Sequence, residues 1–177
     1  VYGGLMAALF EETGRYIAMR FLVKPMDFPN AFMYGAGHGG VEAMLLCGVA
    51  SISNIAGAVM INSGTMSAQL ATLDAEKAAD TAAALSALWT TPSLTFFAGG
   101  VERIIAVVLH LSLSILVFQS IRKKSQKDLL NAYLFHFVID SLSVLLSAVA
   151  SVWVVELVAA LLTGGAVLMA RYACMEE

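Results

Sequence analysis

The chain has 177 residues, of which 59% are hydrophobic and only 13% are charged, and its formal net charge is −3. A soluble domain usually carries about 25% charged residues, so this composition excludes an ordinary soluble protein and predicts an all-α, multi-span transmembrane helical bundle. The sequence holds no basic patch interleaved with aromatic residues, which excludes nucleic acid as a partner.

Five stretches are apolar enough to cross the lipid bilayer, and they predict a single transmembrane domain over residues 1–177. In chain order they cover about 1–23, 36–62, 93–121, 129–151 and 153–172. Because the sequence begins with Val rather than Met, we expect an N-terminally truncated fragment that has lost upstream helices.

The segment 65–91 differs from these five stretches. It is alanine-rich and therefore helical in propensity, but it also carries four charged residues: Asp74, Glu76, Lys77 and Asp80. We expect an extramembrane or interfacial helix here rather than a sixth span.

Basic residues mark one side of the predicted bundle. That side carries Arg20, Lys24, Arg122, Lys123, Lys124, Lys127 and Arg171, and the other side carries only Lys77. Cytoplasmic loops are enriched in Lys and Arg. The distribution predicts a multi-pass cell-membrane protein with its N-terminus outside and its C-terminus in the cytoplasm.

Ionisable residues also lie within the predicted spans, where each unpaired charge costs roughly 2.5–3.5 kcal/mol. Three pairs are four residues apart and share a helix face: Glu11 with Arg15, His38 with Glu42, and His136 with Asp140. The third histidine, His110, lies on one face with Arg103. A lone pair such as Glu11 and Arg15 would indicate only a structural ion pair. All three histidines of the chain belong to this set, however, which favours a catalytic or transport role.

The depth of these residues in the predicted spans supports the same interpretation. Five of them lie two to three helical turns from the basic ends of their spans, about 10–18 Å deep: Glu11, Glu12, His110, His136 and Asp140. We therefore expect the helices to bring them to one level. His38, near the start of 36–62, is expected to lie shallower unless residues 28–37 re-enter the membrane before it.

Four motifs in this order resemble the YhfC family of intramembrane proteases: FEETGR at 10–15, GAGHGGVEA at 35–43, ERIIAVVLH at 102–110 and HFVID at 136–140. The resemblance runs from Gly3 to about Val154 and extends to the CAAX-type prenyl-protein endopeptidases and the PrsW-like proteases. It implies a bacterial inner-membrane protein with a glutamate-dependent peptidase core, acting on membrane-bound peptide or protein substrates.

The motifs of that wider group map onto this sequence in part. Its Glu-Glu-basic motif corresponds to Glu11, Glu12 and Arg15, and its His-x-x-x-Asp motif corresponds to His136 and Asp140. The Phe-x-x-x-His motif of CAAX-type enzymes has no match here. The second histidine is therefore either His38 or His110.

Peptide hydrolysis in a membrane needs an activated water and a group that polarises the scissile carbonyl. Adjacent helix positions point about 100° apart, so only one of Glu11 and Glu12 faces the scissile bond. We expect Glu11 to be the general base, because Arg15 one turn along would keep it ionised. The candidate catalytic residues are Glu11, Glu12, Arg15, His38, Glu42, His110, His136 and Asp140.

In this mechanism His38 or His110 shares the water or takes its proton, His136 donates to the oxyanion, and no cofactor is needed. One alternative is a zinc-dependent protease, with His38, His110 and His136 as ligands and with Glu42 and Asp140 as further oxygen donors. Another is a proton-coupled transporter, since buried Glu, His and Asp chains also serve proton relays. The sequence shows no internal repeat, which counts against a transporter.

Overall fold

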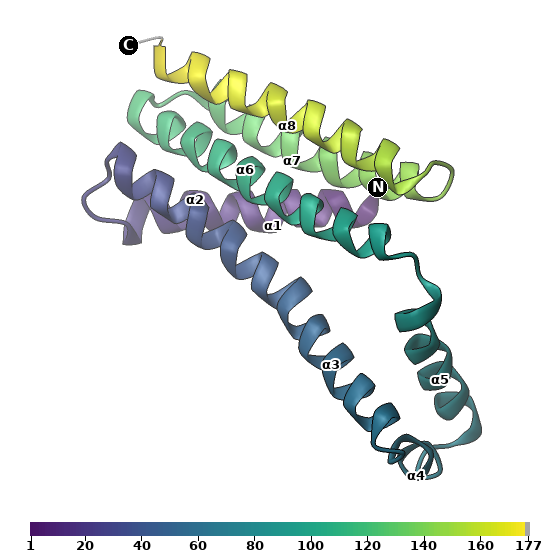
Figure 1. The fold of residues 1–177 in the computed structure, drawn as a ribbon. Helices are drawn as coiled ribbons and strands as arrows, with labels where there is room; N and C mark the ends of the chain where they lie inside the picture. The colour runs from purple at the N-terminus through teal and green to yellow at the C-terminus, as the bar shows by residue number, and fades with distance from the viewer. Residues whose placement is uncertain (176–177) are drawn as a thin grey trace. The chain divides into compact units, whose positions relative to one another are not determined.

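The computed structural model describes residues 1–175, and every regular element in that range is helical (Figure 1). The α-helices are α1 (Tyr2–Ile17), α2 (Phe28–Ala43), α3 (Val49–Asn62), α4 (Met66–Leu70), α5 (Ala75–Thr90), α6 (Ser93–Lys123), α7 (Gln126–Ser147) and α8 (Val152–Met175). There are also two π-helical segments. Ala18–Leu22 follows α1, and Met44–Gly48 joins α2 to α3. The predicted all-α class is confirmed.

The chain forms two compact units. The first contains Val1–Val41 and the chain from Ala98 onward, and it therefore holds α1, most of α2, and α6 to α8. The second contains Glu42–Phe97. The assignment of one domain to residues 1–177 stays a prediction, and its last two residues lie outside the described range.

Four helical stretches within residues 1–175 are long and apolar enough to cross a membrane: Phe28–Asn62, Ser93–Lys123, Gln126–Ser147 and Val152–Met175. They correspond to the second to fifth predicted spans. The first predicted span is also helical, as α1 and its π-helical extension, but it is not among the four. Its three closely spaced charged residues, Glu11, Glu12 and Arg15, make it too polar to qualify.

The predicted start of the second span near residue 36 is wrong, because α2 begins at Phe28. The side chain of Asp27 accepts a hydrogen bond from the backbone N–H of Asn30 at 3.0 Å, which is an N-cap interaction. Pro29 occupies the first turn, where its missing N–H is harmless. His38 therefore lies about 15 Å along the helix axis from Phe28 rather than at the start of the helix.

The core of the first unit is centred on α6. Leu113, Leu116 and Val117 are fully buried there, and they are covered by alanines of neighbouring helices such as Ala132 and Ala166. Small residues of this kind let transmembrane helices approach closely. α7 packs between α1 and α8, and α6, α7 and α8 run side by side (Figure 1).

In the second unit, the predicted segment 65–91 forms α4 and α5, and neither is among the candidate spans within residues 1–175. Asp74 caps α5 by accepting a hydrogen bond from the backbone N–H of Lys77 at 2.9 Å. The Lys77 ammonium also contacts this carboxylate at 2.8 Å. These bonds hold the pKa of Asp74 below its ordinary value. The exposed ion pair is consistent with a helix that contacts water.

Candidate active site

The two adjacent carboxylates of α1 have different surroundings. Glu12 is fully buried, whereas the side chain of Glu11 is 34% exposed. Successive helix positions point about 100° apart, which places one carboxylate against α6 and α7 and leaves the other at an accessible edge. Of the two, Glu11 is the one that a water molecule or a substrate can reach.

Arg15 joins α1 to α6. Its Nε lies 3.1 Å from Oε2 of Glu12, and both side chains are fully buried. Its terminal nitrogens donate to the backbone carbonyl of His110 at 2.7 Å and to Oγ of Ser114 at 2.5 Å. A third contact, at 2.8 Å, reaches Nδ1 of His110. The expected pairing of Arg15 with Glu11 is therefore wrong, because Arg15 pairs with Glu12.

His136 of α7 is buried between three carboxylates. Its Nδ1 lies 2.8 Å from Oε1 of Glu12. Its Nε2 lies 3.5 Å from Oδ2 of Asp140 and 3.8 Å from Oε2 of Glu11. The predicted shared face of His136 and Asp140 is confirmed, and the carboxylate of Glu12 holds the other ring nitrogen of His136.

His38 completes the cluster from α2. Its Nε2 lies 3.0 Å from Oε2 of Glu11. Its ring centre is 4.7 Å from that of His110, and the His110 ring is 5.5 Å from that of His136. All three histidines of the chain therefore converge on Glu11, and they come from three different helices. Tyr34, one turn before His38 on the same face, lies beside it with ring centres 6.1 Å apart.

Two glycines place α2 directly against α6. A Cβ atom at Gly39 would lie 3.0 Å from Cα of Val107, and one at Gly35 would lie 2.9 Å from Cα of Leu111. Gly37 and Gly40 have nothing within 4 Å of the same position. The close approach of α2 to α6 therefore depends on Gly35 and Gly39, which lie one turn apart on the face that carries His38 toward His110.

Glu42 and Arg103 are the remaining ionisable residues that the sequence singled out. Glu42 follows His38 by one turn on α2 and is the first residue of the second unit. Arg103, which shares a face of α6 with His110, forms an ion pair with Glu102. The contact between Tyr34 and His38 was not predicted, although their i,i+4 spacing is a signal for it.

The donor atoms of this cluster suit a transition metal. Glu11, His38 and His110 each offer a ligand atom, and these atoms lie within 4.8 Å of one another. Imidazole nitrogen and carboxylate oxygen are the donors of catalytic zinc sites. His136 also fits, because Glu12 holds its Nδ1 and leaves its Nε2 toward Glu11. Zinc-bound histidines commonly have such a carboxylate partner.

His110 fits a metal less well than the other two histidines. A guanidinium group can only donate hydrogen bonds, so Nδ1 of His110 must accept the bond from Arg15. In the neutral ring the proton is then on Nε2. This assignment makes His110 a hydrogen-bond donor toward the cluster, whereas a ligand needs a free lone pair.

Comparison with known proteins places these residues in a family context. A family model described as YhfC intramembrane metalloprotease matches residues 1–159. A Bacillus subtilis (strain 168) protein, described as an uncharacterized membrane protein YhfC, is 41% identical over 137 residues, which is 77% of this chain and 52% of the relative. The chain therefore spans about half the length of the curated relative that it matches. No solved structure matches the chain.

Proposed function

The chain belongs to the YhfC intramembrane metalloprotease family, and we propose that it is a metal-dependent protease of membrane-bound peptides or proteins. The observation that carries the proposal is the convergence of His38, His110 and His136 on Glu11. Such a group of ionisable side chains inside a helical bundle is costly and marks function.

We propose His38, His136 and Glu11 as the residues that hold the metal. The Nε2 atoms of the two histidines lie 3.0 Å and 3.8 Å from Oε2 of Glu11, and two histidines with one glutamate form an established catalytic zinc set. Glu42, one turn after His38, is a further oxygen donor on that helix face. A zinc ion supplies a water of lowered pKa and polarises the scissile carbonyl.

The remaining residues hold the site and position the substrate. Arg15 and His136 hold the buried carboxylate of Glu12, and Glu12 in turn orients His136. His110 presents its Nε2–H to the substrate carbonyl, where a positioned donor stabilises the oxyanion. Asp140 faces Nε2 of His136 at 3.5 Å and is partly exposed, which suits it to exchange protons with the leaving group.

A glutamate-type protease is the second candidate, and one observation favours it. Glu11 is the accessible carboxylate and already has a histidine partner at 3.0 Å, as a general base needs. In this version Glu11 takes the proton of the water, His38 shares that proton, and no metal is required.

Metal content separates the two candidates. The purified chain is expected to bind zinc at a 1:1 ratio, measured by elemental mass spectrometry. His38→Ala and His136→Ala should lose the metal, whereas the matched His110→Ala variant should keep it. Cleavage of a fluorophore-quencher transmembrane peptide should stop on chelation and return with zinc. Cleavage by the metal-free chain would instead establish the glutamate mechanism.

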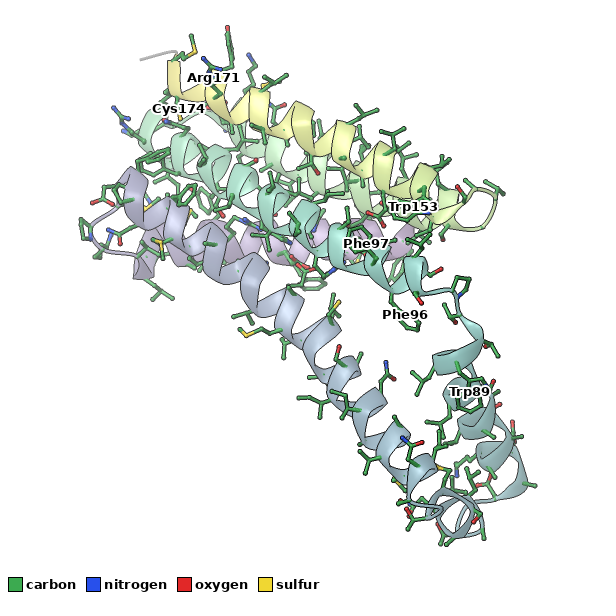
Figure 2. The ribbon with its side chains drawn as sticks, viewed as in Figure 1. Trp89, Phe96, Phe97, Trp153, Arg171 and Cys174 are labelled. Carbon is green, nitrogen blue, oxygen red and sulfur yellow. The ribbon has the colours of Figure 1, made fainter. Side chains whose placement is uncertain are left out.

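We also propose that the end of α6 and the start of α7, on either side of Lys124, face the cytoplasm, as does the C-terminal end of the chain. The support is the concentration of basic residues at these ends, which is typical of the cytoplasmic side. Trp153 and Arg171 lie at opposite ends of α8 (Figure 2). An aromatic residue at one interface and a cation at the other are typical of a spanning helix.

A further inference from the structure

A cavity with both polar and apolar lining residues lies in the first unit, away from the histidine cluster. It has a volume of about 360 Å³ and is formed by α6, the end of α7 and the start of α8. Its polar lining consists of Glu102, Glu156, Ser143 and Ser147. On α6, Glu102 precedes His110 by eight residues, or about 12 Å of helix. The catalytic proposal above therefore makes no use of this cavity.

Glu156 is the unusual residue of this cavity. Only 7% of its surface is exposed, and within residues 1–175 its Oε2 has no hydrogen-bond partner. A buried polar atom without a partner is rare in native proteins and calls for an explanation. Burial of a polar atom without a hydrogen-bond partner also costs free energy. A ligand that donates a hydrogen bond to Oε2 of Glu156 would supply the missing partner and remove this cost.

The ionisable groups at the cavity carry a net negative charge when both carboxylates are ionised. Arg103 forms an ion pair with the adjacent Glu102 and also acts electrostatically on Glu156, so two carboxylates share one guanidinium group. A divalent metal ion usually takes several oxygen ligands, and here it would compete with that guanidinium group for both carboxylates. A monovalent cation balances the site.

The rest of the lining indicates which cation fits. Val144, Val152, Val155 and Ala159 form apolar walls, which suit a short hydrocarbon stem. The carboxylate of Glu156 and the hydroxyl groups of Ser143 and Ser147 are hydrogen-bond acceptors. A primary ammonium group offers three N–H donors. Quaternary ammonium groups lack these donors and prefer aromatic cages, and no aromatic residue lines this cavity.

We propose that this cavity binds a primary ammonium group on a short apolar stem, with Glu156 as its counter-ion. Two sources carry this chemistry, a free alkylamine and the ethanolamine headgroup of a phospholipid. The cavity suits either source, because Glu156 lies in the first turns of α8 and Ser147 ends α7, at the depth of the membrane interface.

Thermal unfolding of the purified chain in detergent tests the proposal, because a ligand of the folded state raises stability. Butylammonium chloride is expected to raise the unfolding temperature saturably. Tetramethylammonium chloride carries the same charge without N–H donors and should have no such effect. Equal stabilisation by both salts, or by neither, would overturn the proposal. Stabilisation by calcium chloride that requires Glu156 would overturn it in favour of a metal site.

Substitutions locate the effect in the cavity. Glu156→Gln should weaken butylammonium binding roughly tenfold to a hundredfold, because a hydrogen bond to a charged group is lost. Glu76→Gln removes the same charge from exposed α5 and should leave binding unchanged. Ser147→Ala should weaken binding roughly threefold to tenfold, and it decides the matter if Glu156→Gln does not fold. Undiminished binding in Ser147→Ala and in any folded Glu156→Gln contradicts the proposal.

Lipid nanodiscs distinguish the two sources. In phosphatidylcholine nanodiscs butylammonium should stabilise the chain, since the choline headgroup has no N–H donor. If ethanolamine lipid occupies the cavity, the effect of butylammonium disappears in phosphatidylethanolamine nanodiscs. If the natural ligand is a free amine, the effect persists in both. Either result supports the ammonium site, whereas no stabilisation in phosphatidylcholine nanodiscs contradicts it.

Discussion

Arg15 donates to Nδ1 of His110 at 2.8 Å while it pairs with Glu12 on its own helix. One side chain therefore neutralises the buried carboxylate and determines which nitrogen of His110 carries the proton. The contact between Arg15 and His110 gives the three histidines different roles. The proton on Nε2 of His110 makes that ring a hydrogen-bond donor. His38 and His136 instead direct their Nε2 atoms toward Glu11, as metal ligands would.

This contact predicts the tautomer of His110. In the chain labelled with ¹⁵N-histidine, the nitrogen spectrum should show one neutral histidine with its proton on Nε2, and that signal should be absent from His110→Ala. In Arg15→Gln the preference should weaken, since an amide does not donate obligatorily. A signal for His110 with its proton on Nδ1 in the unaltered chain would exclude the assigned donor role.

Replacement of Glu11 should lower activity and leave stability unchanged, whereas replacement of Glu12 should lower stability. Glu11→Gln should fold normally and lose roughly 10²–10⁴-fold in cleavage rate. Glu12→Gln leaves Arg15 buried without its carboxylate and should lower the free energy of unfolding by about 3–5 kcal/mol. Unfolding in mixed micelles measures the stability difference. Equal stability of the two variants would contradict the assignment of Glu12 as the structural carboxylate.

The zinc content of Glu11→Gln then tells which role Glu11 has. Loss of zinc is expected for a metal ligand, whereas retention of zinc with loss of cleavage would assign Glu11 as the general base.

The two glycines beside His38 provide a matched pair of substitutions. Gly39→Ala adds a Cβ at 3.0 Å from the backbone of Val107, whereas Gly37→Ala adds one to open space. We expect Gly39→Ala to push α2 away from α6, weaken zinc binding and slow cleavage. Gly37→Ala should behave as the unaltered chain does. Equal zinc affinity in both variants would show that this contact does not position His38.

Labelling tests the proposed orientation of the spans. Single cysteines at positions 77 and 124, in a chain with both natural cysteines replaced, should react with a membrane-impermeant maleimide from opposite sides. Position 124 should be labelled only after the cytoplasmic side is made accessible. Reaction of both positions from one side would contradict the orientation.

The sequence predicted the helical class, the approximate spans and the set of clustered residues, because each of these follows from local pattern. A charge inside an apolar helix must find a partner, and helical spacing shows which residues share a face. The convergence of Glu11, Glu12, His110 and His136 was predictable for that reason, whereas the place of His38 in the cluster was not.

The choice of partners was not predictable from spacing. Glu11 and Arg15 share a face of α1, but His38 and His136 contact Glu11 from other helices, and Arg15 turns to Glu12. Only the packing of four helices decides between these arrangements. The start of α2 was missed for another reason, since Asp27 and Pro29 form a helix start eight residues before the predicted one.

The three hydrogen bonds that Arg15 makes to α6 also bear on the order in which this bundle assembles. In lipid, apolar surface gives helices little reason to associate, and α1 carries charges that are costly without partners. Those partners, His110, Ser114 and His136, are synthesised about a hundred residues later. Stable residence of α1 in the bilayer therefore waits for α6 and α7, although α1 is synthesised before both of them. The protein cannot be stably assembled with its site unformed.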